Sequence, residues 1–281
     1  MVLEQSSVPL KESARLQLPH EDFGSKTMST HHTVAVIPAR MASTRFPGKP
    51  LVPILGLPMI EHVRRRVALT RSISRVVVAT CDREILDVVS ASGGIAVLTS
   101  PAHERCTDRV AEAAANTRAD IIVNVQGDEP CVWPEMLEAV LEPLIADPTL
   151  VCTNLMAPIT REVDFQSSNV VKVVVNLRGD ALYFSREPIP SGKKASDPGF
   201  LKYKQLGIVA FRADFLQTFA RLSPTPLEII ESVDMLREIE HGYAVRMVPC
   251  DRQVVGVDRA EDVARAIELL RDDPLVPQYR R

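Results

Sequence analysis

The chain alternates apolar runs with amphipathic segments from Val34 to about residue 146. Short runs dominated by Val and Ile predict strands, and segments whose apolar residues recur every three to four positions predict helices. The expected strands are 33–38, 75–80, 95–99 and 121–126, and the expected helices are 58–70, 82–92, 107–117 and 134–146. Near-continuous apolar strands between helices are typical of a parallel sheet covered on both faces.

The pattern changes after Pro158. Three further strands have short connections and turn residues, which favours antiparallel pairing, and helices return afterwards. These strands are expected at 170–175, 181–184 and 206–212, followed by helices at 213–222, 227–241 and 260–271 and by one strand at 244–248. We therefore predict an α/β protein with a doubly wound, mostly parallel, Rossmann-like sheet and a smaller antiparallel insertion.

The same pattern divides the chain into four parts. Residues 1–32 are polar and lack sustained periodicity, so they are interpreted as a disordered leader. Residues 33–158 form the expected nucleotide-binding α/β part, and residues 159–212 form the antiparallel insertion. Residues 213–281 supply helices that complete the site.

Composition narrows the function. The 281 residues are 46% hydrophobic and 25% charged, with a formal net charge of −3, which is ordinary for a globular protein and gives no basic field for nucleic acid. Five scattered cysteines without C-x-x-C spacing suggest neither disulfides nor zinc. No apolar run is long enough for a membrane span. A cytoplasmic protein without nucleic-acid or membrane partners is expected.

The segment after the first strand carries candidate phosphate ligands. In open α/β sheets ligands bind beyond the carboxyl ends of the strands. Arg40, Arg45 and Lys49 stand there among small residues such as Ala39 and Ser43, and together they would suit a triphosphate. The segment matches neither G-x-G-x-x-G nor the P-loop motif. A solvated basic loop explains the spacing equally well.

Two aspartates are candidate magnesium ligands, and each has an alternative. Asp128 follows the strand at 121–126 and Gly127, so it should lie at the sheet edge that Arg40 and Lys49 share. Mg²⁺ prefers one or two protein carboxylates together with substrate phosphates. Asp128 would otherwise serve as a turn residue. Asp258 with Glu261 forms the pattern of a capping box, and spacing alone favours that role.

Six motifs resemble the CMP-Kdo synthetase family, the 3-deoxy-manno-octulosonate cytidylyltransferases. They are "IPARMASTRFPGKPL", "VNVQGDEP", "NVVKVV", "LYFSREPIP", "PLE" and "GVDRAEDVARA", in family order between Thr33 and about Leu270. The resemblance implies a nucleotidyltransferase that moves CMP from CTP to an acidic acceptor and releases pyrophosphate. It also implies a homodimer formed through the insertion.

The resemblance assigns roles to residues. Asp128 and Asp258 would hold catalytic Mg²⁺, and the Arg40, Arg45 and Lys49 set would neutralise the phosphates. Thr107, Arg109 and Gln126 would lie near the cytidine, although an ordinary helix start also explains residues 107–112. The family usually has Gly where Cys106 stands and Glu where Asp108 stands.

The acceptor residues depart from the family. Arg186 matches an arginine that binds the acceptor carboxylate, and Gln205, Glu228 and Asp234 are the other expected contacts. However, residues 205–209 read QLGIV where the family has H-L-G-I-Y. Losing several polar contacts argues for an altered acceptor. The resemblance makes a Kdo-type sugar acid the default acceptor. The departures keep a small phosphonate as an alternative acceptor, and another nucleotide base and a non-catalytic binding protein also stay as alternatives.

Overall fold

The computed structural model describes residues 31–42, 46–195, 199–252 and 255–280. Their central feature is a nine-stranded sheet. Its strands are β1 (Thr33–Ala39), β4 (Arg75–Thr80), β5 (Ile95–Leu98), β6 (Ile121–Val125), β7 (Cys152–Pro158), β8 (Lys172–Val175), β9 (Ala181–Ser185), β10 (Tyr203–Arg212) and β11 (Val245–Pro249). A separate two-stranded hairpin consists of β2 (Pro53–Ile54) and β3 (Leu57–Pro58).

Helices connect these strands. They are the 3₁₀ helix η1 (Lys49–Leu51) and the α-helices α1 (Met59–Val67), α2 (Arg83–Ala91), α3 (Cys106–Ala114), α4 (Pro134–Ala146), α5 (Glu162–Gln166), α6 (Ala213–Phe219), α7 (Pro226–Glu231), α8 (Met235–Glu240), α9 (Ala260–Arg271) and α10 (Val276–Tyr279). Among the described residues, no helix is long and apolar enough to cross a membrane.

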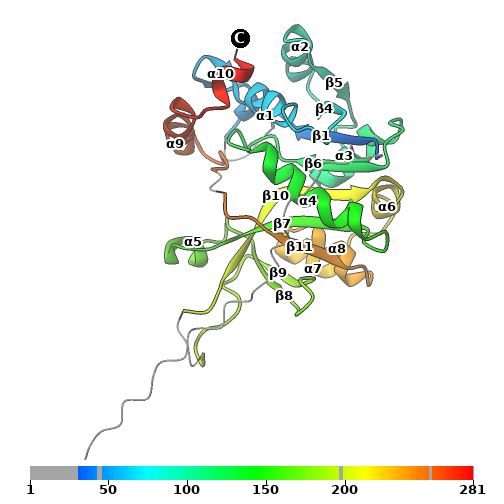
Figure 1. The fold of residues 1–281 in the computed structure, drawn as a ribbon, viewed down its shortest axis with the longest axis vertical. Coiled ribbons are helices and arrows are strands. Elements are labelled where there is room, and N and C mark those ends of the chain that lie inside the picture. Colours follow the sequence, from blue (N-terminus) through cyan, green and yellow to red (C-terminus); the bar gives the residue numbers. More distant parts are fainter. Residues whose placement is uncertain (1–30, 43–45, 196–198, 253–254, 281) are drawn as a thin grey trace, which may run out of the picture. The chain divides into compact units, whose positions relative to one another are not determined.

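The sheet runs in the order β11-β7-β10-β6-β1-β4-β5 (Figure 1). Every neighbouring pair on this path is parallel except the two that involve β10, which is antiparallel to both β6 and β7. Strands β8 and β9 extend β10 as a small antiparallel branch. The predicted fold class, a mostly parallel α/β sheet with a smaller antiparallel part, is confirmed.

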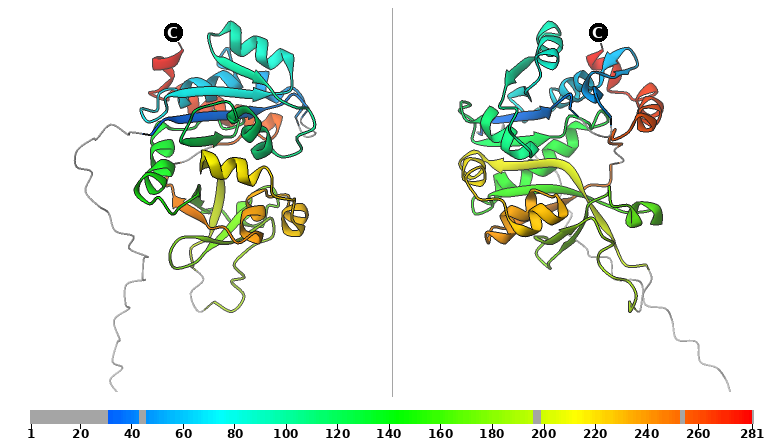
Figure 2. Two further views of the ribbon diagram at one scale, coloured as in Figure 1. Left: turned by 90° about the vertical axis from the view of Figure 1, so that its right-hand side faces the viewer. Right: turned by 180° about the vertical axis from the view of Figure 1, so that it is seen from behind.

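Helices cover both faces of the sheet because side chains alternate along each strand. On β1, Ala35 and Ile37 pack in one core with residues of α1, α2 and α4, whereas Val34 and Val36 pack in a second core with residues of α3, α6 and α8. Figure 1 shows α4 in front of the sheet, and the view from behind in Figure 2 brings α6 and α8 to the near side. A third, smaller core joins the β2–β3 hairpin to the C-terminal helices α9 and α10.

Two expectations about elements were wrong. The helix expected over residues 227–241 is broken into α7 and α8, because Ser232 adopts a left-handed conformation with φ 53°. The strand expected at 206–212 begins at Tyr203 and lies inside the central sheet between β6 and β7. Strand β7 and the short helices α5 and α10 have no counterpart in the prediction.

Candidate active site

The ends of β1 and β6 form the floor of the candidate site. These neighbouring parallel strands end at the same edge of the sheet, so the segments that follow them, which begin at Arg40 and Gln126, start side by side. Gly127 makes the close approach possible. A Cβ atom at this position would lie 2.7 Å from the carbonyl oxygen of Pro38, a distance that side chains do not tolerate.

Backbone hydrogen bonds shape the loop that carries the cations. The N–H of Met41 donates to Asp82 Oδ2 over 2.8 Å, and the N–H of Gly48 donates to the Met41 carbonyl over 3.1 Å. Gly48 has φ 74°, which suits glycine, and η1 begins directly after it at Lys49. The predicted phosphate ligands Ser43 and Arg45 lie outside the described residues.

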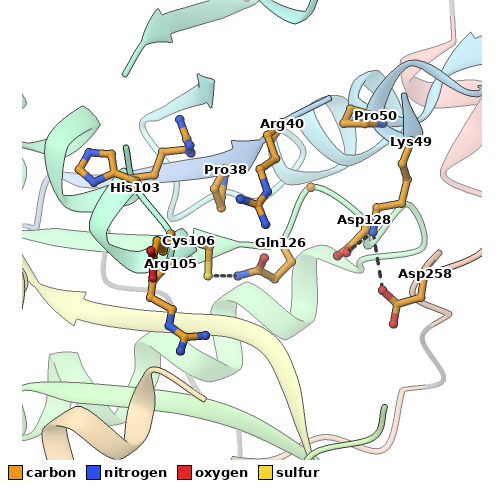
Figure 3. Close-up of a pocket in the computed structure, with 14 residues that line it drawn as sticks. Pro38, Arg40, Lys49, Pro50, His103, Arg105, Cys106, Gln126, Asp128 and Asp258 are labelled. Atoms are coloured by element: carbon orange, nitrogen blue, oxygen red, sulfur yellow. Dashed lines mark hydrogen bonds and ion pairs between the residues drawn. The ribbon is translucent and has the colours of Figure 1, made fainter. Parts of the chain in front are cut away.

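Lys49 stands between the two predicted magnesium ligands. Its Nζ lies 2.7 Å from Asp128 Oδ2 and 3.7 Å from Asp258 Oδ1 (Figure 3). The two aspartates meet because the N–H of Val257 donates to the carbonyl of Asp128 over 2.9 Å. Two residues that are far apart in the sequence therefore present their carboxylates to one cation, facing the loop after β1.

The capping role predicted for Asp258 and Glu261 is wrong. Helix α9 begins after Arg259, and Asp262 Oδ2 accepts the N–H groups of Asp258 and Arg259 over 2.9 and 2.8 Å. Asp262 thus satisfies the backbone at the helix start. The Asp258 carboxylate instead faces Lys49.

A cavity of about 260 Å³ opens over these residues. It is lined by Pro38, Ala39, Arg40, Lys49, Pro50, His103, Glu104, Arg105, Cys106, Arg109, Gln126, Gly127, Asp128 and Asp258. Arg40 is exposed, and its side chain extends into the space above Gln126 in Figure 3. The arrangement places cations and carboxylates around one hollow at the strand ends, which suits a nucleotide with bound phosphates.

A second cavity of about 360 Å³ adjoins the first. Cys106, Gln126 and Asp258 line both cavities and so mark the junction between them. The remaining lining consists of Thr107, Asn124, Glu129, Asn169, Val170, Val171, Lys204, Gln205, Leu206, Gly207, Val209, Asp234 and Gly256. Two adjoining hollows that share an edge can hold two reactants next to each other.

The junction is held by a chain of polar contacts. Gln126 Nε2 donates to Cys106 Sγ over 3.1 Å, and the Thr107 hydroxyl donates to Asp234 Oδ2 over 2.6 Å. Burial, followed by the nearby Asp234 carboxylate, raises the pKa of the Cys106 thiol to about 12. The thiol therefore stays protonated at neutral pH and serves as a polar contact and not as a nucleophile.

The residues predicted near the cytidine take different positions. Arg109 and Gln126 line the first cavity, and the Arg109 guanidinium contacts Thr99 Oγ1. Thr107 is buried and lines the second cavity. Ala39 lines the first cavity beside Arg40.

The predicted acceptor residues are also divided. Gln205 and Asp234 line the second cavity, where Gln205 Nε2 donates to Asn154 Oδ1 over 2.7 Å. Arg186 and Glu228 line neither cavity. The Arg186 guanidinium donates to three backbone carbonyls, those of Ser168, Glu231 and Ser232. Glu228 is buried and pairs with Arg237 over 2.6 Å.

Glu129 is a lining residue that the sequence interpretation missed. Its Oε2 is buried without a hydrogen-bond partner among the described residues. Burial, followed by the charge of Asp128, raises the pKa of Glu129 to about 8. Glu129 directly follows Asp128 in the motif "VNVQGDEP". The motif alone did not indicate which of these two acidic residues would be buried.

Lys204 and Arg105 were also missed. Lys204 lines the second cavity from β10, where a register shift between Gln205 and Val209 breaks the alternation of side chains. A period of two therefore could not predict which residues of this strand face the site. Arg105 lines the first cavity just before α3 and donates to Ser232 Oγ over 2.7 Å.

The donor set at Lys49 fits a hard divalent cation. No group of three or more His, Cys, Asp or Glu side chains among the described residues could hold a metal alone. Asp128 and Asp258 supply two carboxylates whose side chains are 31% and 41% exposed, which leaves them open to an ion and to phosphate. Mg²⁺ usually keeps several waters and binds one or two carboxylates plus substrate phosphates.

The fold and this constellation define a nucleotidyltransferase-like α/β enzyme. A family model described as cytidylyltransferase matches residues 34–247. The 3-deoxy-manno-octulosonate cytidylyltransferases of Geobacter metallireducens and Syntrophotalea carbinolica are 46% and 47% identical over 245 and 244 residues. These matches cover 84% of this chain and 96% and 98% of the relatives. The chain therefore belongs to the cytidylyltransferase family and, within it, groups with the 3-deoxy-manno-octulosonate cytidylyltransferases.

A solved structure supports the same placement. CMP:2-keto-3-deoxy-manno-octonic acid synthetase, in its complex with CTP, is 38% identical and superposes with a TM-score of 0.80, covering 85% of this chain and 98% of that chain. A 4-diphosphocytidyl-2C-methyl-D-erythritol synthase from Anaerococcus prevotii is only 12% identical, with a TM-score of 0.59, and it shares the fold alone.

Proposed function

We propose that the protein is a Mg²⁺-dependent cytidylyltransferase that transfers CMP from CTP to a Kdo-type sugar acid and releases pyrophosphate. The observation that carries this proposal is the convergence of Asp128 and Asp258 on Lys49 at the edge of two adjoining cavities. The names of the most similar relatives supply the nucleotide and the acceptor.

The first cavity is proposed as the CTP site. Arg40 and Lys49 would contact the phosphates, since guanidinium and ammonium groups both bind phosphate oxygens strongly. Arg109 and Gln126, with Ala39 beside them, would contact the base or ribose. Ser43 and Arg45 belong to the same loop and stay in the proposal on the resemblance of the motif.

The second cavity is proposed as the acceptor site. Its lining includes several side-chain amides and three carboxyl groups, those of Glu129, Asp234 and Asp258, but only one cation among the described residues. Amide oxygens and carboxylates accept hydrogen bonds from hydroxyl groups. This lining therefore suits a molecule with many hydroxyls and a single negative charge. The carboxylates of Asp234 and Asp258 would repel a small phosphonate dianion more than the single carboxylate of a sugar acid, which favours the sugar acid. Gln205 and Asp234 are the proposed hydroxyl contacts.

The reaction would proceed by direct displacement. A hydroxyl oxygen of the acceptor attacks the α-phosphorus of CTP, the bond to the β-phosphate oxygen breaks, and the hydroxyl proton is released. Asp128 and Asp258 would hold Mg²⁺, which supplies positive charge to the phosphates when bound. Lys49 and Arg40 would stabilise the charge that develops on the leaving pyrophosphate. The raised pKa of Cys106 gives no support to a covalent intermediate.

The test is a pyrophosphate-release assay with CTP, Kdo and Mg²⁺. Wild-type protein should release pyrophosphate only when all three are present. Asp128→Asn should lower kcat/KM by about a hundred- to a thousand-fold, because one carboxylate ligand is lost. Asp87→Asn, on the exposed surface of α2, is the matched control and should behave as wild type. Sustained turnover in excess EDTA would refute the metal dependence.

The same assay separates the alternatives. Pyrophosphate release with a small phosphonate but not with Kdo would identify the phosphonate as the acceptor. A thermal-shift series with CTP, UTP, GTP and ATP would identify the nucleotide base that the protein binds. If no acid leads to pyrophosphate release, the result would favour a non-catalytic binding protein. A cytoplasmic homodimer completes the proposal by analogy with the family, and light scattering of the purified protein would measure its mass.

A further inference from the structure

Asn124 is a polar residue at an apolar position of the central sheet. It lies on β6, whose other four residues are apolar and fully buried. The residues that pair with it on the neighbouring strands are Val36 of β1 and Val209 of β10. The side chain of Asn124 is itself buried, with 1% of the residue exposed. An amide in such surroundings costs free energy unless it is hydrogen-bonded.

The amide oxygen of Asn124 has no hydrogen-bond partner among the described residues. Asn154 of β7 lies in the same row of the sheet, since both asparagines pair with one residue of β10. The Asn154 Nδ2 donates to the carbonyls of Leu206 and Ile208, each over 2.9 Å, and its Oδ1 accepts from Gln205. The sheet therefore satisfies one of the two amides and leaves the oxygen of the other for a donor from elsewhere.

The second cavity is where that donor can come from. Asn124 and Thr107, each 1% exposed, are the most buried residues of its lining. In the described part of the chain, only Glu129 shares with Asn124 a place in this cavity and a buried oxygen without a partner. Glu129 is acidic and follows the proposed metal ligand Asp128, whereas the Asn124 amide is neutral. A neutral amide suits a hydroxyl group, which both donates and accepts hydrogen bonds.

We propose that Asn124 binds one hydroxyl group of the acceptor at the buried side of the second cavity. The assignment rests on the proposed function and adds to it a residue that selects the acceptor. The torsion that turns an Asn amide is broad, so the oxygen can swing into the cavity. No hydrogen bond of that oxygen to a described residue has to break. An acceptor without this hydroxyl would leave a buried amide unpaired, and a site built in this way discriminates strongly.

The test uses analogues of Kdo that each lack one hydroxyl group, in the pyrophosphate-release assay with CTP and Mg²⁺. For wild-type protein, kcat/KM should be about ten-fold lower with the analogue that lacks the recognised hydroxyl. Asn124→Val should use that analogue and Kdo equally well within about two-fold, and it should keep the wild-type preference at the other hydroxyls. Asn124→Thr has the shape of the Val variant but retains a hydroxyl, so it should keep part of the preference.

Thermal unfolding supplies a second readout. Asn124→Val removes a buried oxygen that has no partner among the described residues, so its Tm should stay at or above the wild-type value. Thr153→Val is the matched control, because the buried Thr153 hydroxyl on β7 donates to the Val140 carbonyl over 2.6 Å and lines neither cavity. The control should lose about 2–4 °C in Tm and keep the wild-type preference for every hydroxyl.

The outcomes separate the two proposals. If wild-type protein uses Kdo and no analogue distinguishes it from Asn124→Val, the assignment of Asn124 is wrong and the proposed function stands. A loss of Tm in Asn124→Val as large as in Thr153→Val, with every analogue affected equally, would show that ordered water satisfies the amide and that its role is structural. If wild-type protein releases no pyrophosphate with Kdo, the proposed acceptor fails and the Asn124 assignment fails with it.

Discussion

The buried acidic side chains of this protein differ in whether a cation reaches them. Glu228 pairs with Arg237 over 2.6 Å, and Glu61 pairs with Arg64 and Arg65 over 2.7 and 2.8 Å. Glu238, on α8, is fully buried, and the polar group next to its carboxyl is the buried thiol of Cys152 and not a cation. Burial raises the pKa of Glu238 well above its usual value, so the folded protein holds this carboxyl in its neutral form.

Glu238 should make stability fall as the pH rises. Above the ordinary pKa of a carboxyl, the unfolded chain releases this proton while the folded chain keeps it, so raising the pH favours unfolding until the raised pKa is reached. One retained proton contributes at most about 1.4 kcal/mol per pH unit. Glu238→Gln should flatten the pH dependence of the free energy of unfolding between about pH 5 and pH 8, measured by urea denaturation.

The exposed neighbour Glu240 supplies the control for this prediction. It lies at the end of the same helix, and its carboxylate accepts the N–H of Leu227 over 3.0 Å, which a Gln oxygen can also do. Glu240→Gln should keep the wild-type slope. A wild-type slope in Glu238→Gln would show that the carboxyl is ionised or hydrated in the folded protein.

At the residue scale, the sequence predicted the charges that converge at the strand ends. Arg40, Lys49 and Asp128 follow adjacent parallel strands, and this geometry is implied by the pattern of strands and helices. Asp258 needed the family resemblance, because its spacing equally suited a helix cap that Asp262 in fact provides. Lys204 was not predicted, since the expected strand began two residues after it, at 206, whereas β10 begins at Tyr203.

At the element scale, the site depends on how closely β1 and β6 end beside each other. Gly127 lies two residues after the end of β6. Its Cα faces the carbonyl of Pro38 in β1. Glycine is needed at this position because a methyl group would collide with the neighbouring strand.

Gly127→Ala should therefore displace the turn that carries Asp128. A Cβ atom would lie 2.7 Å from the Pro38 oxygen, so the backbone must move. Overpacking of this kind costs about 1–3 kcal/mol of folding stability. A shift of Asp128 relative to Lys49 should also lower kcat more than about ten-fold. Chemical denaturation and pyrophosphate release measure the two effects.

Gly256→Ala is the matched control for this element. Gly256 lies in the segment before Asp258, and a Cβ atom there would meet its nearest neighbour, Glu129 Oε1, at 3.6 Å, which is ordinary contact. Its backbone is not left-handed. The control should keep wild-type stability. Equal losses of folding stability in both variants would show that the closeness of β1 and Gly127 does not cause the loss in Gly127→Ala.

Element boundaries were predictable where the pattern was local. The helices at Pro134–Ala146 and Ala260–Arg271 have the expected ends. The break between α7 and α8 was not visible, because the left-handed residue is Ser232 and not glycine. Its carbonyl and that of Glu231 accept hydrogen bonds from the guanidinium of Arg186, which directly follows β9 about 45 residues earlier.

At the scale of the described molecule, residues distant in sequence complete the sheet and the site. Strand β10 inserts between β6 and β7, and β11 pairs with β7 over residues 245–249. Such long-range pairing has no signature in periodicity. The class of fold was predictable because it needs only the alternation of elements, whereas the order of strands was not.

The C-terminal segment closes the molecule onto α1 through a buried arginine. Arg66 is fully buried, and its Nε donates to the Val132 carbonyl over 2.6 Å, in the segment that leads from Asp128 to α4. Its Nη1 pairs with Asp273 over 3.0 Å, and its guanidinium lies over the rings of Trp133 and Tyr279. The last residues of the chain thus help to fix the segment that follows the proposed metal ligand.

Asp273→Asn should test this link between the chain end and the site. The substitution keeps an oxygen to accept the N–H of Leu275 but removes the charge that balances Arg66. Removing one partner of a buried ion pair leaves an uncompensated charge and costs about 3–5 kcal/mol. The free energy of unfolding should fall by about that amount, and kcat/KM should fall further than in the exposed control Asp272→Asn. Since Arg66 reaches the segment after Asp128 through the Val132 carbonyl and the Trp133 ring, a destabilised variant with full activity at low temperature would show that the C-terminal segment supports the fold without positioning Asp128.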